Sequence, residues 1–150
     1  MLTLHGHDFC CSRSRFEDQD RRASEPTAKI FVAIRLPGVS TLLWAQLDTG
    51  SAWSVLDPET AEAAGISAED GIAQVLLTRL GPIEGRLVKV PITLTADEGE
   101  SLDLEGTFFI APAWPPGKSF LGYSGLLDSI RFALDPAANH FYFGASEGRP

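Results

Sequence analysis

Leu47-Asp48-Thr49-Gly50-Ser51 lies at the end of an apolar run, residues 42–45, that has the composition of a β-strand. We expect this strand to deliver Asp48 to its far end, where the chain must turn. Gly50 permits a tight turn and a close backbone approach, which a side chain with a Cβ would hinder. Thr49 and Ser51 add hydroxyls that can bond to a neighbouring backbone. The loop therefore suits the presentation of one carboxylate at the floor of a cleft, and the alternative is a turn aspartate that caps its own backbone.

Short β-branched and aromatic runs on both sides of this loop predict a mainly β domain. Residues 30–36 and 41–47 are separated by a Pro-Gly turn and predict a hairpin that ends at Asp48. After the loop, Asp57 as N-cap and Pro58 at the first helical position predict a short helix that stops at Gly65. The pattern of many short strands with one or two small helices fits a single domain.

Residues 72–95 hold two apolar stretches that predict a second hairpin. Two glycines and a proline lie between the stretches, and mobile glycine-rich hairpins commonly serve as lids. A plain surface hairpin is the alternative. The residues predicted to form this lid, or flap, are Gly81, Pro82, Ile83, Glu84 and Gly85.

Phe120-Leu121-Gly122 is the second informative stretch of the chain. A short polar gap and a Leu-Leu pair follow it, which predicts a strand running into a short helix. Residues 131–134 and 140–143 predict a final hairpin. His140 in this hairpin has no serine or cysteine nucleophile near it in the sequence, so we expect it to pack on an edge strand.

Length and charge restrict the classes of function that this chain can have. The 150 residues fit one domain with a real core, and 44% hydrophobic with 21% charged residues is an ordinary globular composition. Residues 1–29 carry five basic and five acidic side chains, so the net charge of −8 lies in residues 30–150 and disfavours nucleic-acid binding. No apolar run approaches the roughly 18 residues of a membrane helix, and we expect a cytoplasmic protein that does not bind membranes.

The first 29 residues differ in composition from the rest of the chain. They are rich in Arg, Ser, Asp and Glu and lack a sustained period, which predicts a flexible leader over 1–29 before a domain over 30–150. Cys10 and Cys11 are adjacent, which excludes a disulfide framework. These cysteines, with His5 and His7, form a tight group of potential zinc ligands without the loop that usually separates ligand pairs, so no metal site is expected.

Over about residues 30–144 the chain resembles the retropepsin-like aspartic proteases, which are single-domain, retroviral-type enzymes, and in particular their bacterial members. The resemblance rests on Asp48-Thr49-Gly50, on Phe120-Leu121-Gly122 and on the hairpin between them, where the family places its flap at 78–86. It implies a closed β-barrel with one or two short helices and a flap hairpin. It also implies an aspartic endopeptidase that hydrolyses peptide bonds without a cofactor or metal.

The resemblance further implies a homodimer, because family members use two aspartates that share a proton and this chain has one Asp-Thr-Gly. Asp48 from each chain would activate water, Thr49 would bridge backbone groups across the dimer axis, and Gly50 would let the peptide or protein substrate approach. The hydroxyl of Ser51 is expected to donate to Asp48. Leu121 and Gly122 would pack beneath the catalytic loop.

Two departures from the family pattern affect the expected dimer. Tyr123 stands where retroviral enzymes usually have an arginine that helps to hold the dimer, and Gly125 lengthens the gap before the leucine pair by one residue. The interface must therefore be built differently or be weaker. The alternative function is a catalytically silent module of the same fold that holds an extended peptide by strand-like pairing.

Overall fold

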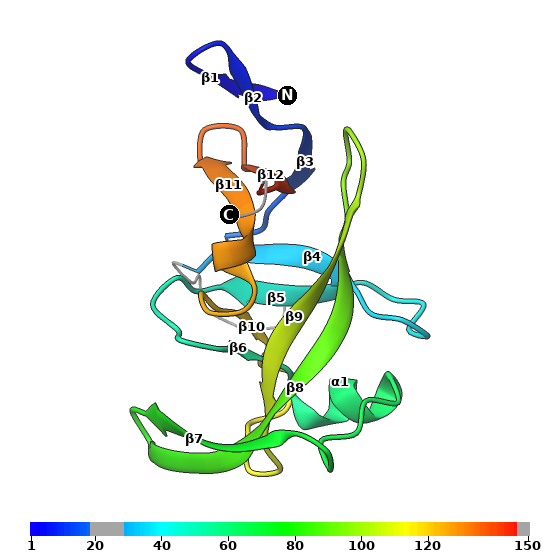
Figure 1. Ribbon diagram of the computed structural model, residues 1–150, viewed down its shortest axis with the longest axis vertical. Helices are drawn as coiled ribbons and strands as arrows, with labels where there is room; N and C mark the ends of the chain where they lie inside the picture. Colours follow the sequence, from blue (N-terminus) through cyan, green and yellow to red (C-terminus); the bar gives the residue numbers. More distant parts are fainter. Residues whose placement is uncertain (19–28, 147–150) are drawn as a thin grey trace.

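A ring-like sheet of seven strands forms the body of the protein (Figure 1). The computed structural model describes residues 1–18 and 29–146. The strands of this sheet lie in the order β4-β5-β10-β6-β9-β8-β7, and a further pairing of β4 with β8 closes the ring. They are β4 (Phe31–Arg35), β5 (Leu43–Leu47), β6 (Ser54–Val55), β7 (Ile72–Thr78), β8 (Gly81–Leu94), β9 (Leu102–Ile110) and β10 (Phe120–Leu121). The predicted mainly β barrel is confirmed.

The core lies inside this ring, and strand alternation builds it. In β8, Val90, Ile92 and Leu94 are buried while Lys89 and Pro91 are exposed, because successive side chains of a strand point to opposite faces. Each fully buried aliphatic side chain of this kind contributes about 1.5–3 kcal/mol to stability. β8 pairs with β9 from Arg86, opposite Ile110, to Leu94, opposite Leu102, along the whole length of β9.

Two of the predicted local elements are present where the sequence places them. β4 and β5 pair antiparallel and form the hairpin that leads to Asp48. Helix α1 (Pro58–Ala63) begins after Asp57, whose side chain accepts the Thr60 N–H at 3.1 Å. Gly65 follows the helix with φ +68°, a conformation that few other residues adopt. A short 3₁₀ helix, η1 (Leu127–Ser129), follows β10.

The N-terminal segment differs from the prediction over residues 1–18. It forms β1 (Leu2–Leu4), β2 (His7–Cys10) and β3 (Ser12–Arg15), and β3 completes a three-stranded sheet with β11 (Ile130–Asp135) and β12 (His140–Ala145). Phe16 is buried, as are the small side chains of Ser12 and Ser14 that alternate with exposed or half-buried arginines. Because the buried residues of β3 are serines, the sequence shows no apolar alternation there. The prediction of a flexible leader is therefore wrong for these residues. The remainder of the expected leader, 19–28, lies outside the described residues.

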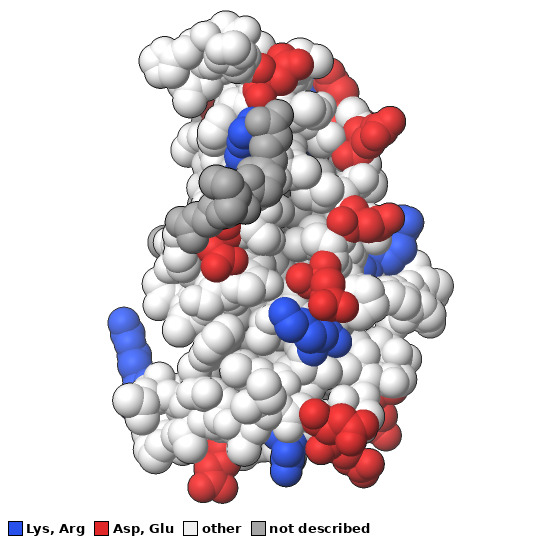
Figure 2. Space-filling view, in the orientation of Figure 1, with Lys and Arg blue, Asp and Glu red and all other residues white. Residues whose placement is uncertain are grey.

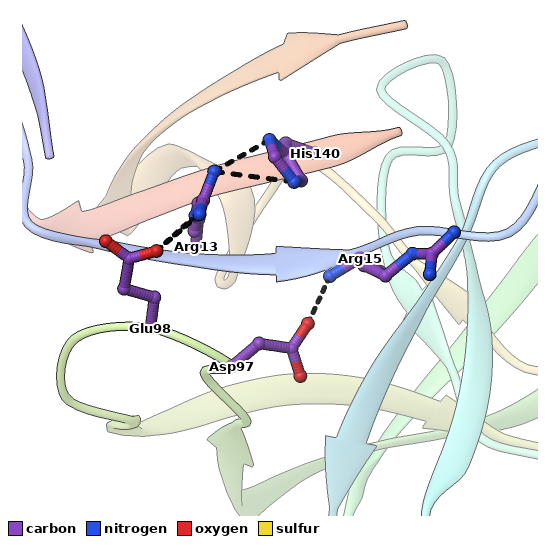
Figure 3. A network of polar contacts seen from close by, with 5 residues as sticks. All are labelled: Arg13, Arg15, Asp97, Glu98 and His140. Carbon is purple, nitrogen blue, oxygen red and sulfur yellow. Dashed lines mark hydrogen bonds and ion pairs between the residues drawn. The ribbon is translucent and has the colours of Figure 1, made fainter. Parts of the chain in front are cut away.

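Polar contacts attach β3 to two other parts of the fold (Figure 3). The Arg13 guanidinium pairs with the Glu98 carboxylate in the turn between β8 and β9, and it donates to Nδ1 of His140 at 3.0 Å. The backbone N–H of Arg15 donates to the Asp97 carboxylate at 2.7 Å. His140 therefore lies on the central strand of its sheet, not on an edge strand as expected, because β3 covers that edge.

Cys10 belongs to the buried part of this N-terminal segment. Its thiol is fully buried and donates to the carbonyl of Arg131 at 3.6 Å. Burial raises the pKa of Cys10 to about 11, with a further increase from Cys11 beside it and an opposing effect from Arg131. Cys10 is thus a packing residue, whereas Cys11 is exposed.

The surface is acidic and the charges on it are dispersed. Figure 2 shows separate groups of acidic side chains over one face, with fewer basic side chains among them, in keeping with the net charge of −8. Within residues 1–18 and 29–146, no helix has both the length and the apolar character needed to cross a bilayer.

Candidate active site

The loop after β5 holds Asp48 through backbone hydrogen bonds and orients its carboxylate. The Asp48 N–H donates to the carbonyl of Leu121 at 3.0 Å, and the N–H of Ser51 donates back to the carbonyl of Asp48 at 3.2 Å. The N–H of Gly50 donates to Oδ1 of Asp48 at 3.0 Å. Asp48 is half-buried. Its carboxylate is therefore fixed through one oxygen, and among the described residues no hydrogen bond reaches the other.

Ser51 supports the loop in a different way from the one expected. Its hydroxyl donates to the carbonyl of Trp53 at 2.7 Å. A hydroxyl carries one proton, so Ser51 does not donate to Asp48 in this arrangement, and the expectation is wrong. Thr49 and Gly50 are both exposed in the single chain.

The second motif lies against this loop, as expected for a supporting strand. β10 runs parallel to β5, with Leu121 opposite Leu47, and antiparallel to β6. Leu121 is buried, and the N–H of Gly122 donates to the Ser54 hydroxyl at 2.9 Å. A Cβ on Gly122 would lie 2.3 Å from the carbonyl group of Trp53, so only glycine fits here.

The two departures from the family pattern lie just beyond this motif. The N–H of Tyr123 donates to the carbonyl of Ser51 at 2.9 Å, while the Tyr123 side chain is 51% exposed beside the Asp48 loop. Gly125 adopts φ +75°, and its carbonyl accepts the N–H of Thr107. The additional residue is thus taken up in a left-handed turn attached to β9.

The hairpin of β7 and β8 faces Asp48 across a cleft of about 570 Å³. Its turn lies at Thr78–Gly81, where Gly81 has φ +103° and its carbonyl accepts the Thr78 hydroxyl at 2.8 Å. The cleft is lined by Asp48, Gly50, Ser51, Ala52, Trp53, Val55, Gln74, Val75, Leu76, Leu77, Thr78, Arg79, Trp114 and Phe120. The wall opposite Asp48 is therefore strand β7 and the turn.

The predicted flap residues lie in this hairpin, on its second strand, opposite the residues of β7 that line the cleft. Gly81, Pro82, Ile83, Glu84 and Gly85 form the first part of β8, and none of them lines the cleft. A two-residue turn at 79–80 places the tip before Gly81, whereas the sequence prediction centred it on the proline. Gly81, with its positive φ immediately after this turn, was the signal in the sequence for where the hairpin turns. Gly85 is a packing residue, since a Cβ there would lie 2.6 Å from the Ile110 carbonyl oxygen.

Aromatic side chains form an apolar part of the cleft lining. The ring of Trp114 packs edge-to-face on Phe120 at 5.8 Å and on Phe109 at 6.4 Å between centroids. Its indole N–H donates to the carbonyl of Lys118 at 2.6 Å, which fixes the proline-rich loop in place. Trp53 and Val55 contribute to the same apolar lining. Such a lining suits apolar side chains of a bound molecule.

A second carboxylate near the loop was assigned by the sequence only as a helix cap. Asp57 is 1% exposed, and it bonds to Thr60 on the helix and to Ser119 just before β10. Burial acts to raise the pKa of Asp57, but hydrogen bonds from Thr60, Ser119 and the Gly117 backbone outweigh it and hold the pKa below its usual value. The proximity of residue 119 to Phe120-Leu121-Gly122 was the available signal for this contact.

Comparison with known proteins supports the fold assignment. No protein-family model and no curated protein sequence matches the chain. A solved structure, the crystal structure of a retropepsin-like aspartic protease from Rickettsia conorii, is similar with a TM-score of 0.53 and 13% sequence identity. The similarity covers 89% of this chain and 91% of that one. At this identity the comparison concerns the fold, and the fold of this chain is that of the retropepsin-like aspartic proteases.

Proposed function

We propose that this protein is an aspartic endopeptidase. The observation that carries the proposal is a single half-buried carboxylate, Asp48, on a hydrogen-bonded loop in a cleft with a partly apolar lining. Leu121 and Gly122 hold that loop from below, and the β7–β8 hairpin lies across the cleft from it. The similarity to a retropepsin-like aspartic protease supports a hydrolase of this type.

The proposed enzyme acts as a homodimer, because peptide hydrolysis by this chemistry needs two carboxylates and each chain supplies one Asp-Thr-Gly. Two carboxylates that lie close together share one proton. The ionised one takes a proton from the attacking water, while the protonated one donates to the carbonyl oxygen of the scissile bond. Thr49 and Gly50 are exposed on the single chain and are available to a second copy.

The proposed substrate is an extended segment of peptide or protein. β7 is the last strand in its sheet, so among the described strands its outer edge has no partner, and β7 lines the cleft. A peptide in extended form can hydrogen-bond to such an edge while its alternate side chains enter the apolar lining around Trp53 and Trp114.

Cleavage of a peptide library from about pH 3 to about pH 8 tests this function, because the dyad requires one protonated and one ionised carboxylate. The wild-type chain should cleave, and pepstatin should inhibit it. Asp48→Asn should abolish turnover while peptide binding persists. Asp70→Asn removes an exposed carboxylate outside the cleft and serves as the matched control, with turnover unchanged.

Absence of cleavage at every pH, or equal turnover by Asp48→Asn, would contradict the proposal. Peptide binding followed through the fluorescence of Trp53 and Trp114 then distinguishes the alternative. Tight binding without cleavage in both wild type and Asp48→Asn would identify a peptide-binding module of the same fold.

A further inference from the structure

We propose that Asp57 and Ser119 form a buried pair of positioning residues that fixes β10 and, through it, Asp48. The kinetic consequence of the Asp57–Ser119 pair rests on the proposed function, whereas its effect on the Asp48 loop does not. Neither residue lines the cleft, so the pair acts on the reacting group only through the backbone.

The contacts within the pair are reciprocal. The Ser119 hydroxyl donates to Oδ2 of Asp57 at 3.1 Å, and the backbone N–H of Asp57 donates to the same hydroxyl oxygen at 3.2 Å. Both residues are buried, with exposures of 1% for Asp57 and 4% for Ser119. Hydrogen bonds between buried groups, one of them ionised, are strong and directional, so they fix the relative position of the two chain segments.

This pair exceeds what a helix cap requires. A capping aspartate needs one carboxylate oxygen for a backbone N–H of the first turn, and Oδ1 of Asp57 performs that function with Thr60. Oδ2 accepts two hydroxyl protons, one from Thr60 at 2.5 Å and one from Ser119 at 3.1 Å. The contact with Ser119 joins the helix start to a segment 62 residues further along the chain.

A short path of backbone contacts connects the pair to Asp48. The carbonyl of Ser119 accepts the N–H of Gln46 at 2.9 Å, which sets β10 beside β5. Two residues later, the carbonyl of Leu121 accepts the N–H of Asp48 at 3.0 Å. β10 itself has only two residues and pairs with β5 and β6, so contacts at its ends add to the few bonds that place it. The Asp57–Ser119 pair holds one end, and Gly122 bonded to Ser54 holds the other.

Two single variants separate positioning from helix capping. Ser119→Ala removes the contact to β10 and leaves the cap of α1 intact. Thr60→Ala removes a hydroxyl bond on the helix side and leaves Ser119 bonded to Asp57. We expect Ser119→Ala to lower kcat by about tenfold with KM changed less than about twofold, since a displaced catalytic group impairs turnover more than binding. Thr60→Ala should lower the unfolding temperature and leave kcat unchanged.

Hydrogen exchange provides a readout that needs no activity. In Ser119→Ala, the amide of Asp48 should exchange faster because its acceptor on Leu121 is less well held, while amides of the β8–β9 ladder keep their protection. Ser119→Thr retains the hydroxyl and should restore both the Asp48 protection and kcat. If no peptide is cleaved by the wild type, the exchange comparison still decides the proposal.

The double variant gives the last check. Asp57→Asn combined with Ser119→Ala should reduce kcat and Asp48 protection no further than the more damaging single variant, because Ser119→Ala already removes the bond from the Ser119 hydroxyl to the Asp57 carboxylate. Additive losses would overturn the proposal. Unchanged exchange at Asp48 in a folded Ser119→Ala protein would overturn it as well, as would an equal loss of kcat in Thr60→Ala.

Discussion

Two aspartates nine positions apart have opposite surroundings in this fold. Asp48 is half-buried, lines the cleft, and accepts the N–H of Gly50 through one oxygen. Asp57 is fully enclosed, and Thr60 and Ser119 supply donors to both of its oxygens. An acid that must exchange protons with a substrate needs an accessible oxygen. A buried carboxylate whose two oxygens both accept hydrogen bonds is suited instead to holding chain segments together.

The lowered pKa of Asp57 predicts how its contribution to stability depends on pH. Folding favours the ionised form, so this contribution is complete above the ordinary value of 3.8 and is lost as the pH falls through the lower value of the folded state. Asp57→Asn should reduce the free energy of unfolding by about 1–3 kcal/mol at neutral pH, because hydrogen bonds to a charged acceptor are lost.

Urea unfolding of wild type and Asp57→Asn at several pH values measures this difference. It should be constant near neutral pH and should shrink as the pH falls below 3.8. A difference that grows with acidity would show that the folded protein does not favour the ionised carboxylate.

At the scale of elements, the N-terminal strand shows where prediction from the sequence succeeds and where it fails. The β4–β5 hairpin, α1 and the last hairpin were predictable because turn residues, a capping aspartate and apolar runs mark them. β3 was not, because its buried positions are serines whose hydroxyls bond within the fold, such as Ser12 to the Glu100 carbonyl at 2.7 Å. Contacts of that kind depend on a partner 88 residues away, which no local pattern reveals.

The candidate site, too, was predictable from the sequence only in part. The Asp48 loop and its support by Leu121 and Gly122 could be predicted from two short motifs that place backbone groups together. The cleft wall at 74–79 and the hydroxyl partner of Ser51 could not, because hairpin register and hydroxyl direction depend on packing that the motifs do not encode.

Phe16→Ala tests whether the N-terminal segment is part of the fold. Phe16 is 4% exposed in the main core, so truncation should cost about 3–5 kcal/mol of unfolding free energy. Arg15→Ala is the matched control on the same segment: its side chain is exposed and its backbone bond to Asp97 is retained, so the change should stay within about 0.5 kcal/mol. Chemical unfolding measures both, and a leader without structure would give two neutral substitutions.

At the scale of the whole molecule, the single chain carries half of the proposed catalytic dyad. The exposed Thr49, Gly50 and Tyr123 lie together because the Tyr123 N–H bonds to the loop at Ser51. A second copy that brings its Asp48 beside the first must meet this surface, since both loops have to approach a common two-fold axis. In the proposed dimer Tyr123, which is 51% exposed, would provide an aromatic contact in place of the arginine that retroviral enzymes usually have there.

Mixing subunits tests the shared site directly. Asp48→Asn chains should form dimers with wild-type chains, and such mixed dimers should be inactive because one acid of the dyad is missing. With an excess of about nine to one of the variant, about one in ten wild-type subunits retains a wild-type partner, so the rate should fall about tenfold. The same excess of Asp48→Asn carrying Tyr123→Asp as well should inhibit much less, because a buried unpaired charge disfavours the interface. A rate that is indifferent to added Asp48→Asn, at concentrations where sedimentation shows exchange of subunits, would mean that one chain performs the reaction with its own residues.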